Sequence, residues 1–233
     1  MKAAIMRNPV SPFIKICCIC SAQEAEQAIA AGASAIGLVS AMPSGPGIID
    51  EKQIAEIASA IPPPIATFLL TSLQTAEAIA EQHTRCRTTV LQLADHLPLD
   101  ELRKLRAWLP GIKLVQVIHV TGPGSVKEAI TVSGYVDAIL LDSGNPNAAV
   151  KQLGGTGRTH DWRLSRIISH SVRTPLFLAG GLTPDNVSHA ISTVSPFGLD
   201  VCSGVRTDGR LDPQKLRAFF HNLSLPFTDR RRH

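Results

Sequence analysis

Eight short apolar runs recur along this chain, and each is followed by a longer stretch whose apolar residues repeat with helical periodicity. The runs occupy residues 13–19, 35–40, 65–70, 89–93, 114–120, 138–143, 176–180 and 199–203. Most intervals between them have the length of one turn, one helix and a second turn. The runs are continuous Ile, Leu, Val and Ala rather than alternating, which is typical of strands buried on both faces. The pattern predicts a parallel sheet covered by helices.

The helical stretches carry ordinary start signals. Ser21 and Glu24 have the spacing of a capping box before a helix over 25–31. Asp50 is placed to cap the next helix. Pro184 opens a later one, and Asp212 followed by proline opens the last, because proline at the first helical position gives up no hydrogen bond.

Eight strand–helix units in strict alternation predict an α/β fold of the closed type, a single (β/α)8 TIM barrel. An open doubly wound sheet is the alternative, and it is disfavoured because no Gly-x-Gly-x-x-Gly sequence follows the first run. The length of 233 residues suits one barrel. We expect an N-terminal extension over 1–12, the barrel over 13–223, and a basic C-terminal tail over 224–233.

The charge and cysteine patterns exclude several classes of partner. The net charge is +4, but Arg230, Arg231 and Arg232 supply much of it, and aromatic residues are only 4% of the chain. A nucleic-acid groove is therefore not expected. Five cysteines, three of them within one run, do not resemble a secreted disulfide framework. No apolar run is long enough to span a bilayer, and we expect a cytoplasmic protein. The oligomeric state is left open.

Three glycine-bearing loops follow the last three strands, at 153–158, 179–182 and 202–205. Glycine lets backbone N–H groups approach an anion closely, and this rim of a barrel commonly holds a phosphate. The alternative is that the glycines only make tight turns. We predict a phosphate site, and thus a phosphorylated small-molecule substrate, formed by Gly155, Thr156, Gly157, Gly180, Gly181, Ser203 and Gly204.

Two titratable residues lie where the first and sixth strands are expected to end. Cys17 could act as a base or a nucleophile, although a buried cysteine is more often a small apolar residue. Asp142 ends an apolar run, where a carboxylate needs a partner or a pocket. Asp200 is ambiguous in the same way. His119 could line the pocket, and the alternative is a solvated loop histidine. Cys17 and Cys20 would point to opposite faces of a strand, and no second Cys/His pair is present, so no metal site is expected.

In combination these motifs resemble those of the phosphoribosylanthranilate isomerases, the barrel enzymes of the tryptophan pathway. The matching segments are Lys-Ile-Cys at 15–17, Leu-Gln-Leu at 91–93, Leu-Leu-Asp at 140–142, Gly-Gly-Thr-Gly-Arg-Thr-His-Asp-Trp at 154–162, Leu-Ala-Gly-Gly-Leu-Thr-Pro-Asp-Asn-Val at 178–187 and Asp-Val-Cys-Ser-Gly-Val at 200–205. The resemblance covers about residues 13 to 220 and is strongest in the second half.

The resemblance implies a cofactor-free Amadori rearrangement of N-(5-phosphoribosyl)anthranilate to the 1-deoxyribulose 5-phosphate product. Asp142 matches the family's general acid and Cys17 its general base. One proton donor and one acceptor with shifted pKa values suit this chemistry. Further pocket residues are expected at Gln92, His119, Arg158, Asp200 and Arg206.

The chain departs from the family on one side of the site. The family usually carries a basic residue after the second strand, which pairs with the anthranilate carboxylate, but residues 35–51 contain no Lys or Arg. Cys18 replaces a glycine, Ala94-Asp95 replaces His-Gly, and Arg206 stands where many members have Glu. Arg158 or Arg206 could replace the missing cation. Alternatively, the substrate is another phosphorylated aminosugar, or the barrel binds a phosphometabolite without catalysis.

Overall fold

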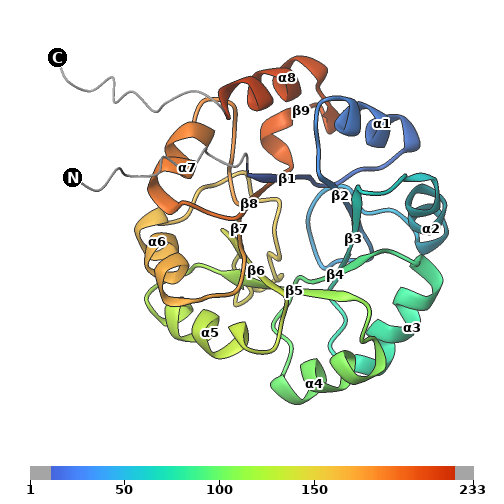
Figure 1. Cartoon of the computed structure of the whole chain (residues 1–233), viewed down its shortest axis with the longest axis vertical. Helices are drawn as coiled ribbons and strands as arrows, with labels where there is room; N and C mark the ends of the chain where they lie inside the picture. Colours follow the sequence, from blue (N-terminus) through green and yellow to red (C-terminus); the bar gives the residue numbers. More distant parts are fainter. Residues whose placement is uncertain (1–11, 224–233) are drawn as a thin grey trace, which may run out of the picture.

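The computed structural model describes residues 12–223, and eight parallel strands close into a barrel in the order in which they occur in the chain. The strands are β1 (Phe13–Ile16), β2 (Ala35–Val39), β3 (Ala66–Thr71), β4 (Val90–Leu93), β5 (Lys113–His119), β6 (Ala138–Asp142), β7 (Leu176–Leu178) and β8 (Gly198–Val201). Figure 1 shows them as a central ring surrounded by helices. The predicted (β/α)8 barrel is confirmed. The expected tail, and all of the expected extension except Pro12, lie outside the described residues.

The outer layer consists of helices that follow the strands. They are α1 (Ala22–Ala30), α2 (Glu51–Ala60), α3 (Ala76–Cys86), α4 (Leu99–Trp108), α5 (Gly124–Ser133), α6 (Trp162–Ser171), α7 (Val187–Val194) and α8 (Pro213–Asn222). A 3-10 turn, η1 (Ser203–Val205), and a short hairpin of β9 (Arg206–Thr207) and β10 (Arg210–Leu211) lie between β8 and α8. No helix among residues 12–223 is long and apolar enough to cross a membrane.

Three predicted helix starts agree with the structure. Ser21, Asp50 and Asp212 cap α1, α2 and α8, each accepting a backbone N–H of the first turn. The expected helix start at Pro184 is wrong: α7 begins at Val187. The reason is local, because the Asn186 side chain accepts from the Thr183 N–H and holds residues 183–186 in a turn.

Apolar packing is divided between the barrel interior and the layer between strands and helices. The interior holds Phe68, Val115 and Leu140 with their neighbours, while fully buried residues such as Leu38 and Leu91 pack toward the helices. Each buried aliphatic side chain of this kind stabilises the fold by about 1.5–3 kcal/mol. This rigid scaffold places the carboxyl ends of all eight strands on one rim.

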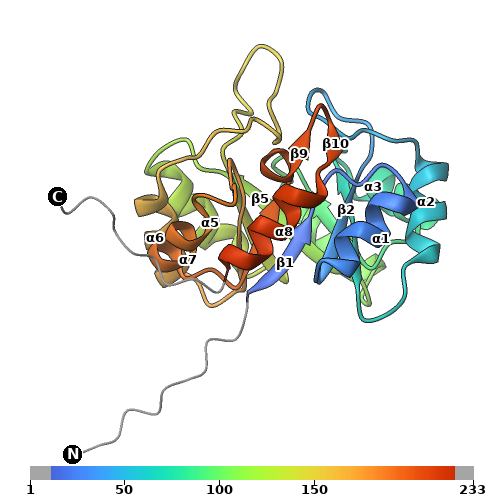
Figure 2. The same ribbon diagram turned by 90° about the horizontal axis from the view of Figure 1, so that it is seen from above.

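Strand register sets which polar residues are neighbours at that rim. Lys15 lies beside Asp200 in the β1–β8 pairing, and His119 lies beside Asp142 in the β5–β6 pairing. In Figure 2 the loop between β6 and α6, the loop after β2 and the β9–β10 hairpin all project from the same end of the barrel. They enclose the space above the strands.

The first strand is shorter than the predicted run over 13–19. β1 ends at Ile16, and Cys18 adopts a left-handed backbone conformation with φ of 62°. Such a residue cannot continue a strand. Cys17 therefore lies directly after the strand, in a turn, rather than on the strand.

Candidate functional site

A cavity opens at the carboxyl ends of the strands. Ten of the predicted site residues line it: Cys17, Asp142, Gly155, Thr156, Gly157, Gly180, Gly181, Ser203, Gln92 and Asp200. They come from β1, β4, β6, β7, β8 and the loops that follow them. The barrel rule that places functional groups at this rim thus brings together residues far apart in sequence.

The Cys17 thiol lies beside a fully buried lysine. Lys15 Nζ is 3.3 Å from Cys17 Sγ and 2.8 Å from Asp200 Oδ2, and the Lys15 side chain has no exposed surface. Burial opposes the charge on Lys15, but Asp200 and Cys17 outweigh it and raise the pKa of the amine, so Lys15 stays a cation.

The pKa of Cys17 is lowered from its ordinary value. The main cause is a hydrogen bond from the Cys18 thiol, and the charge and hydrogen bond of Lys15 act in the same direction against burial and Asp200. The Cys18 thiol has its pKa raised by the same contact and stays protonated. A buried thiol with a neighbouring cation and a neighbouring donor is suited to serve as a thiolate base.

Asp142, the last residue of β6, carries a carboxyl group with the opposite shift. Its side chain is buried, and this burial raises the pKa, although the Ser143 N–H, 2.7 Å from Oδ1, partly offsets the effect. Gly154 and Gly180 pack against the carboxyl oxygens so closely that an added Cβ would lie 2.8 Å and 3.1 Å from them. A carboxyl that stays protonated more readily than usual is suited to donate a proton.

Backbone geometry makes the end of the cavity near β7 and β8 rich in glycine. Gly155, Gly157, Gly180 and Gly181 all have positive φ, which side chains other than glycine rarely adopt. Gly204 itself does not line the cavity, but a Cβ there would collide with the Leu182 carbonyl, so the two loops are in backbone contact. Glycine-rich loops in contact can present several N–H groups to one anion.

Hydroxyl groups extend this end of the cavity. Thr156 Oγ1 lies 2.6 Å from Ser143 Oγ, which links the β6–α6 loop to the end of β6. The exposed Ser203 follows β8 and faces the same space. Their hydroxyls can donate to phosphate oxygens beside the backbone amides.

The wall formed by β2, β3 and β4 is different in character. It presents Val39, Met42, Leu70 and the ring of Pro46, together with the polar Gln92. The Oε1 atom of Gln92 is buried without a partner among residues 12–223. Within the described part of the chain, no Lys or Arg side chain lines the cavity.

Three predicted pocket residues are turned away from the cavity. His119 donates through its ring to the Ala94 carbonyl and is covered by Gly144. Arg158 is exposed and bonds Gln152, and Arg206 is buried against Glu24. Neither arginine lines the cavity in this arrangement.

Sequence reasoning missed two features of the site. Lys15 belonged to the quoted motif, and its spacing of two residues from Cys17 could have placed both on one face. Its pairing with Asp200 depends on the β1–β8 register, which is set by barrel closure. The apolar wall with Met42 and Leu70 carried no motif at all.

These features define a single barrel with one rim cavity, in which a proton donor and a proton acceptor lie next to a glycine-rich anion site. A family profile described as "N-(5'phosphoribosyl)anthranilate (PRA) isomerase" matches residues 14–222. The chain belongs to the N-(5'-phosphoribosyl)anthranilate isomerase family, as the sequence motifs predicted.

Individual relatives agree with this assignment. The N-(5'-phosphoribosyl)anthranilate isomerase of Methanocella arvoryzae is 36% identical over 211 residues, which is 90% of this chain and 97% of the relative. The phosphoribosyl anthranilate isomerase of Thermotoga maritima superposes with a TM-score of 0.77 at 28% identity, covering 91% of this chain and 98% of that one. Another solved isomerase, with a TM-score of 0.75 and 26% identity over 91% and 98% of the two chains, contains reduced 1-(o-carboxyphenylamino)-1-deoxyribulose 5-phosphate.

Proposed function

We propose that this protein converts N-(5'-phosphoribosyl)anthranilate to 1-(o-carboxyphenylamino)-1-deoxyribulose 5-phosphate by an Amadori rearrangement, a step of tryptophan biosynthesis. The observation that carries the proposal is that the Cys17 thiol, 3.3 Å from the Lys15 amine, and the buried Asp142 carboxyl line one cavity together with the glycine loops. Family membership supplies the substrate.

In the first step Asp142 donates its proton to the ring oxygen of the sugar. The bond between that oxygen and C1 breaks, and the nitrogen lone pair forms the C=N bond of a protonated Schiff base. In the second step the Cys17 thiolate removes the proton from C2, and the C–H electrons give an enolamine. The enolamine becomes the ketone by gaining a proton at C1 and losing one from the 2-hydroxyl. No atom is gained or lost, which is why acid–base catalysis suffices.

Lys15 stabilises the resting thiolate and stays charged because Asp200 holds it. The phosphate is expected at Gly155, Thr156, Gly157, Gly180, Gly181, Ser203 and Gly204. Binding energy from this non-reacting group orients the sugar between acid and base. We place the enzyme in the cytoplasm, where a reducing environment keeps Cys17 a free thiol.

The test follows the loss of anthranilate fluorescence when purified protein is added to freshly generated phosphoribosylanthranilate. Cys17→Ser and Asp142→Asn should each lower kcat by about a hundredfold to ten-thousandfold, as removal of a general acid or base does. Matched controls are Cys86→Ser on α3 and Asp50→Asn, in which asparagine still caps α2. Full activity in either site variant would contradict the assigned roles.

A second candidate is isomerisation of another phosphorylated aminosugar. The absence of a lysine or arginine lining the described cavity favours it, because the anthranilate carboxylate has no cationic partner there. Binding of ribose 5-phosphate without turnover of phosphoribosylanthranilate would support this candidate over the first. A barrel that binds but does not catalyse would show neither turnover nor sensitivity of binding to Cys17→Ser.

A further inference from the structure

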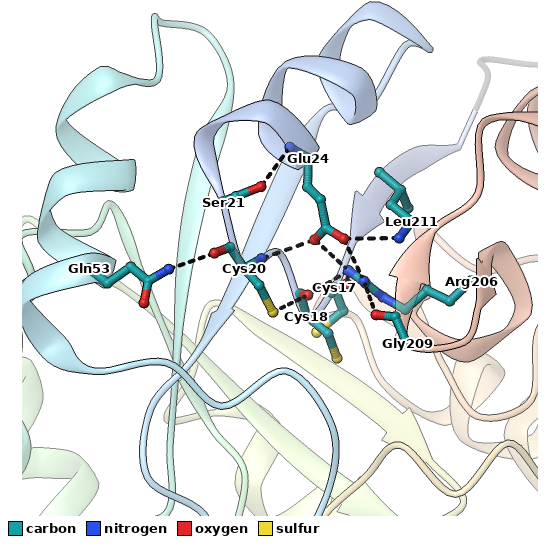
Figure 3. Close-up of polar contacts among 9 residues, drawn as sticks. All are labelled: Cys17, Cys18, Cys20, Ser21, Glu24, Gln53, Arg206, Gly209 and Leu211. Atoms are coloured by element: carbon teal, nitrogen blue, oxygen red, sulfur yellow. Dashed lines mark hydrogen bonds and ion pairs between the residues drawn. The ribbon is translucent and has the colours of Figure 1, made fainter.

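Arg206, the first residue of β9, is buried and gathers five hydrogen bonds. Its Nη1 donates to Glu24 Oε1 at 2.9 Å and to the Gly209 carbonyl at 3.0 Å. Its Nη2 donates to Glu24 Oε2 at 3.1 Å, to the Cys17 carbonyl at 3.3 Å, and in a short contact to the Cys18 carbonyl. Figure 3 shows the guanidinium between the carboxylate of Glu24 and the turn that carries Cys17.

Glu24 extends this arrangement to two further backbone groups. Its carboxylate also accepts the Cys20 N–H at 3.0 Å and the Leu211 N–H at 2.9 Å. Although burial opposes its charge, the bonds from Arg206, Leu211 and Cys20 outweigh burial and lower the pKa of Glu24. We call Glu24 and Arg206 the clamp, because together they join α1, the turn over 17–20 and the β9–β10 hairpin.

The turn over 17–20 needs such support. Cys18 has a left-handed backbone, and its side chain packs so closely on Gly47 that a Cβ at Gly47 would strike it. That conformation is unfavourable for a residue with a side chain and persists where the surroundings impose it. Bonds from a charged donor are stronger than neutral ones, so the guanidinium is well suited to hold the two carbonyls.

The position of these carbonyls determines where the Cys17 side chain points, because the direction of Cβ follows from the backbone. The thiol then lies 3.3 Å from Lys15 Nζ. Arg206 itself does not line the cavity, which excludes a direct contact with substrate in this arrangement. It does follow η1 directly, so the same residue ties the glycine loop after β8 to the turn of the base.

We propose that Arg206 is a positioning residue of the reaction. Its forked guanidinium, which is anchored by Glu24, holds the backbone of Cys17 and Cys18 so that the Cys17 thiolate faces the sugar. The inference rests on the proposed function for its kinetic consequence. Its structural consequence, the placement of the thiol beside Lys15, does not depend on which substrate is used.

The kinetic test compares the variants Arg206→Gln and Arg206→Lys with the parent protein, all as full-length chains. Arg206→Gln should lower kcat by about tenfold to a hundredfold, which is the effect expected of a small misplacement of a reacting group. Arg206→Lys keeps the charge but not the fork, and should also lower kcat. Calorimetric titration of both variants with reduced 1-(o-carboxyphenylamino)-1-deoxyribulose 5-phosphate should find as many binding sites per molecule as in the parent. The affinity should lie within about threefold of the parent's, since the clamp does not line the cavity.

The matched control is Arg106→Gln, which breaks another partly buried arginine pair, with Asp137, far from the rim cavity. It should lower stability without changing kcat. A kcat of Arg206→Gln within about twofold of the parent would overturn the positioning role. A fall in kcat no larger than the fall in the fraction of molecules that bind the ligand would overturn it as well. If Arg206→Gln does not fold, Arg206→Lys and Glu24→Gln carry the same comparison.

A second readout separates failure of the inference from failure of the proposed function. The pH dependence of Cys17 alkylation by iodoacetamide, followed by mass spectrometry, reports the thiolate that Lys15, Asp200 and Cys18 surround. Arg206→Gln should move its midpoint to higher pH, as the thiol loses its alignment with Lys15. An unchanged midpoint would overturn the inference even if the parent protein turned over phosphoribosylanthranilate, and a shifted one would support it even if the parent did not.

Discussion

The two sides of the cavity are built in opposite ways. The side formed by β1, β6, β7 and β8 carries the ionised and titratable groups and the glycine loops, with Lys15, Cys17 and Asp142 all buried. The side formed by β2, β3 and β4 offers apolar surface around Met42 and Leu70 and a single amide. Proton transfer and phosphate binding require particular atoms at particular places, whereas an aromatic ring requires only a surface of the right shape. The first side therefore carries most of the motifs that resemble the family, with Cys18 and Arg206 as departures, and the second side lacks the family's basic residue after β2.

The largest effect is expected when the buried Lys15 cation is removed from the side of the cavity that carries the titratable groups. Lys15→Met leaves Asp200 buried without its cation and should lower the free energy of unfolding by about 3–5 kcal/mol. It also removes a cause that lowers the Cys17 pKa, so that pKa rises, the thiolate fraction at neutral pH falls, and the acid limb of kcat/KM moves to higher pH. Urea denaturation and a pH–rate profile measure the two effects.

Lys15→Met combined with Asp200→Asn should recover part of the lost stability but not the activity. The surface control Lys113→Met should change the free energy of unfolding by less than about 1 kcal/mol, as exposed ion pairs contribute little. If the single variant were as stable as the control, Lys15 and Asp200 would not form the pair that sets the charged side apart.

An intermediate effect is expected at the glycine loops. Gly204→Ala pushes the loop after β8 away from the Leu182 carbonyl, and losing one or two charge-assisted bonds to phosphate should raise KM by about tenfold to a hundredfold. Competitive inhibition by ribose 5-phosphate measures the same loss without catalysis. The control Gly134→Ala has open space around its Cβ and should leave both values unchanged. Equal inhibition constants for Gly204→Ala and Gly134→Ala would mean that the phosphate does not bind at the loop after β8.

The smallest effect is expected on the apolar side. Met42→Arg adds a cation to the wall that lacks one, and should lower KM for phosphoribosylanthranilate by about twofold to fivefold, in line with a solvent-accessible ion pair. The gain should fade as salt is added. Met42→Gln is the uncharged control. A salt-independent change, or none, would mean that the carboxylate does not face this wall.

Sequence patterns predicted the fold and most of the cavity, because strand ends and glycine loops are local signals. Asp142 and Gly180 could be placed at the rim simply by where their apolar runs stopped. The contacts of Arg206 could not be predicted, since its partner Glu24 lies 182 residues away and the Cys18 backbone that it holds has no sequence signature apart from the family's glycine. Arg206 was expected in the pocket because a rim arginine suggested a ligand for the substrate. Its burial against a carboxylate is a consequence of barrel closure, which no local pattern encodes.

The bonding of the Cys17 carbonyl to Arg206, 189 residues later in the sequence, has a consequence during protein synthesis. The thiol is synthesised long before Asp200, which bonds the Lys15 amine beside it, and Arg206, which bonds its backbone carbonyl. A nascent chain therefore holds the thiol before it holds the residues that fix its surroundings. On the proposed function, we expect activity only after β8 has closed the barrel, because Asp200 lies on that strand and Arg206 follows it.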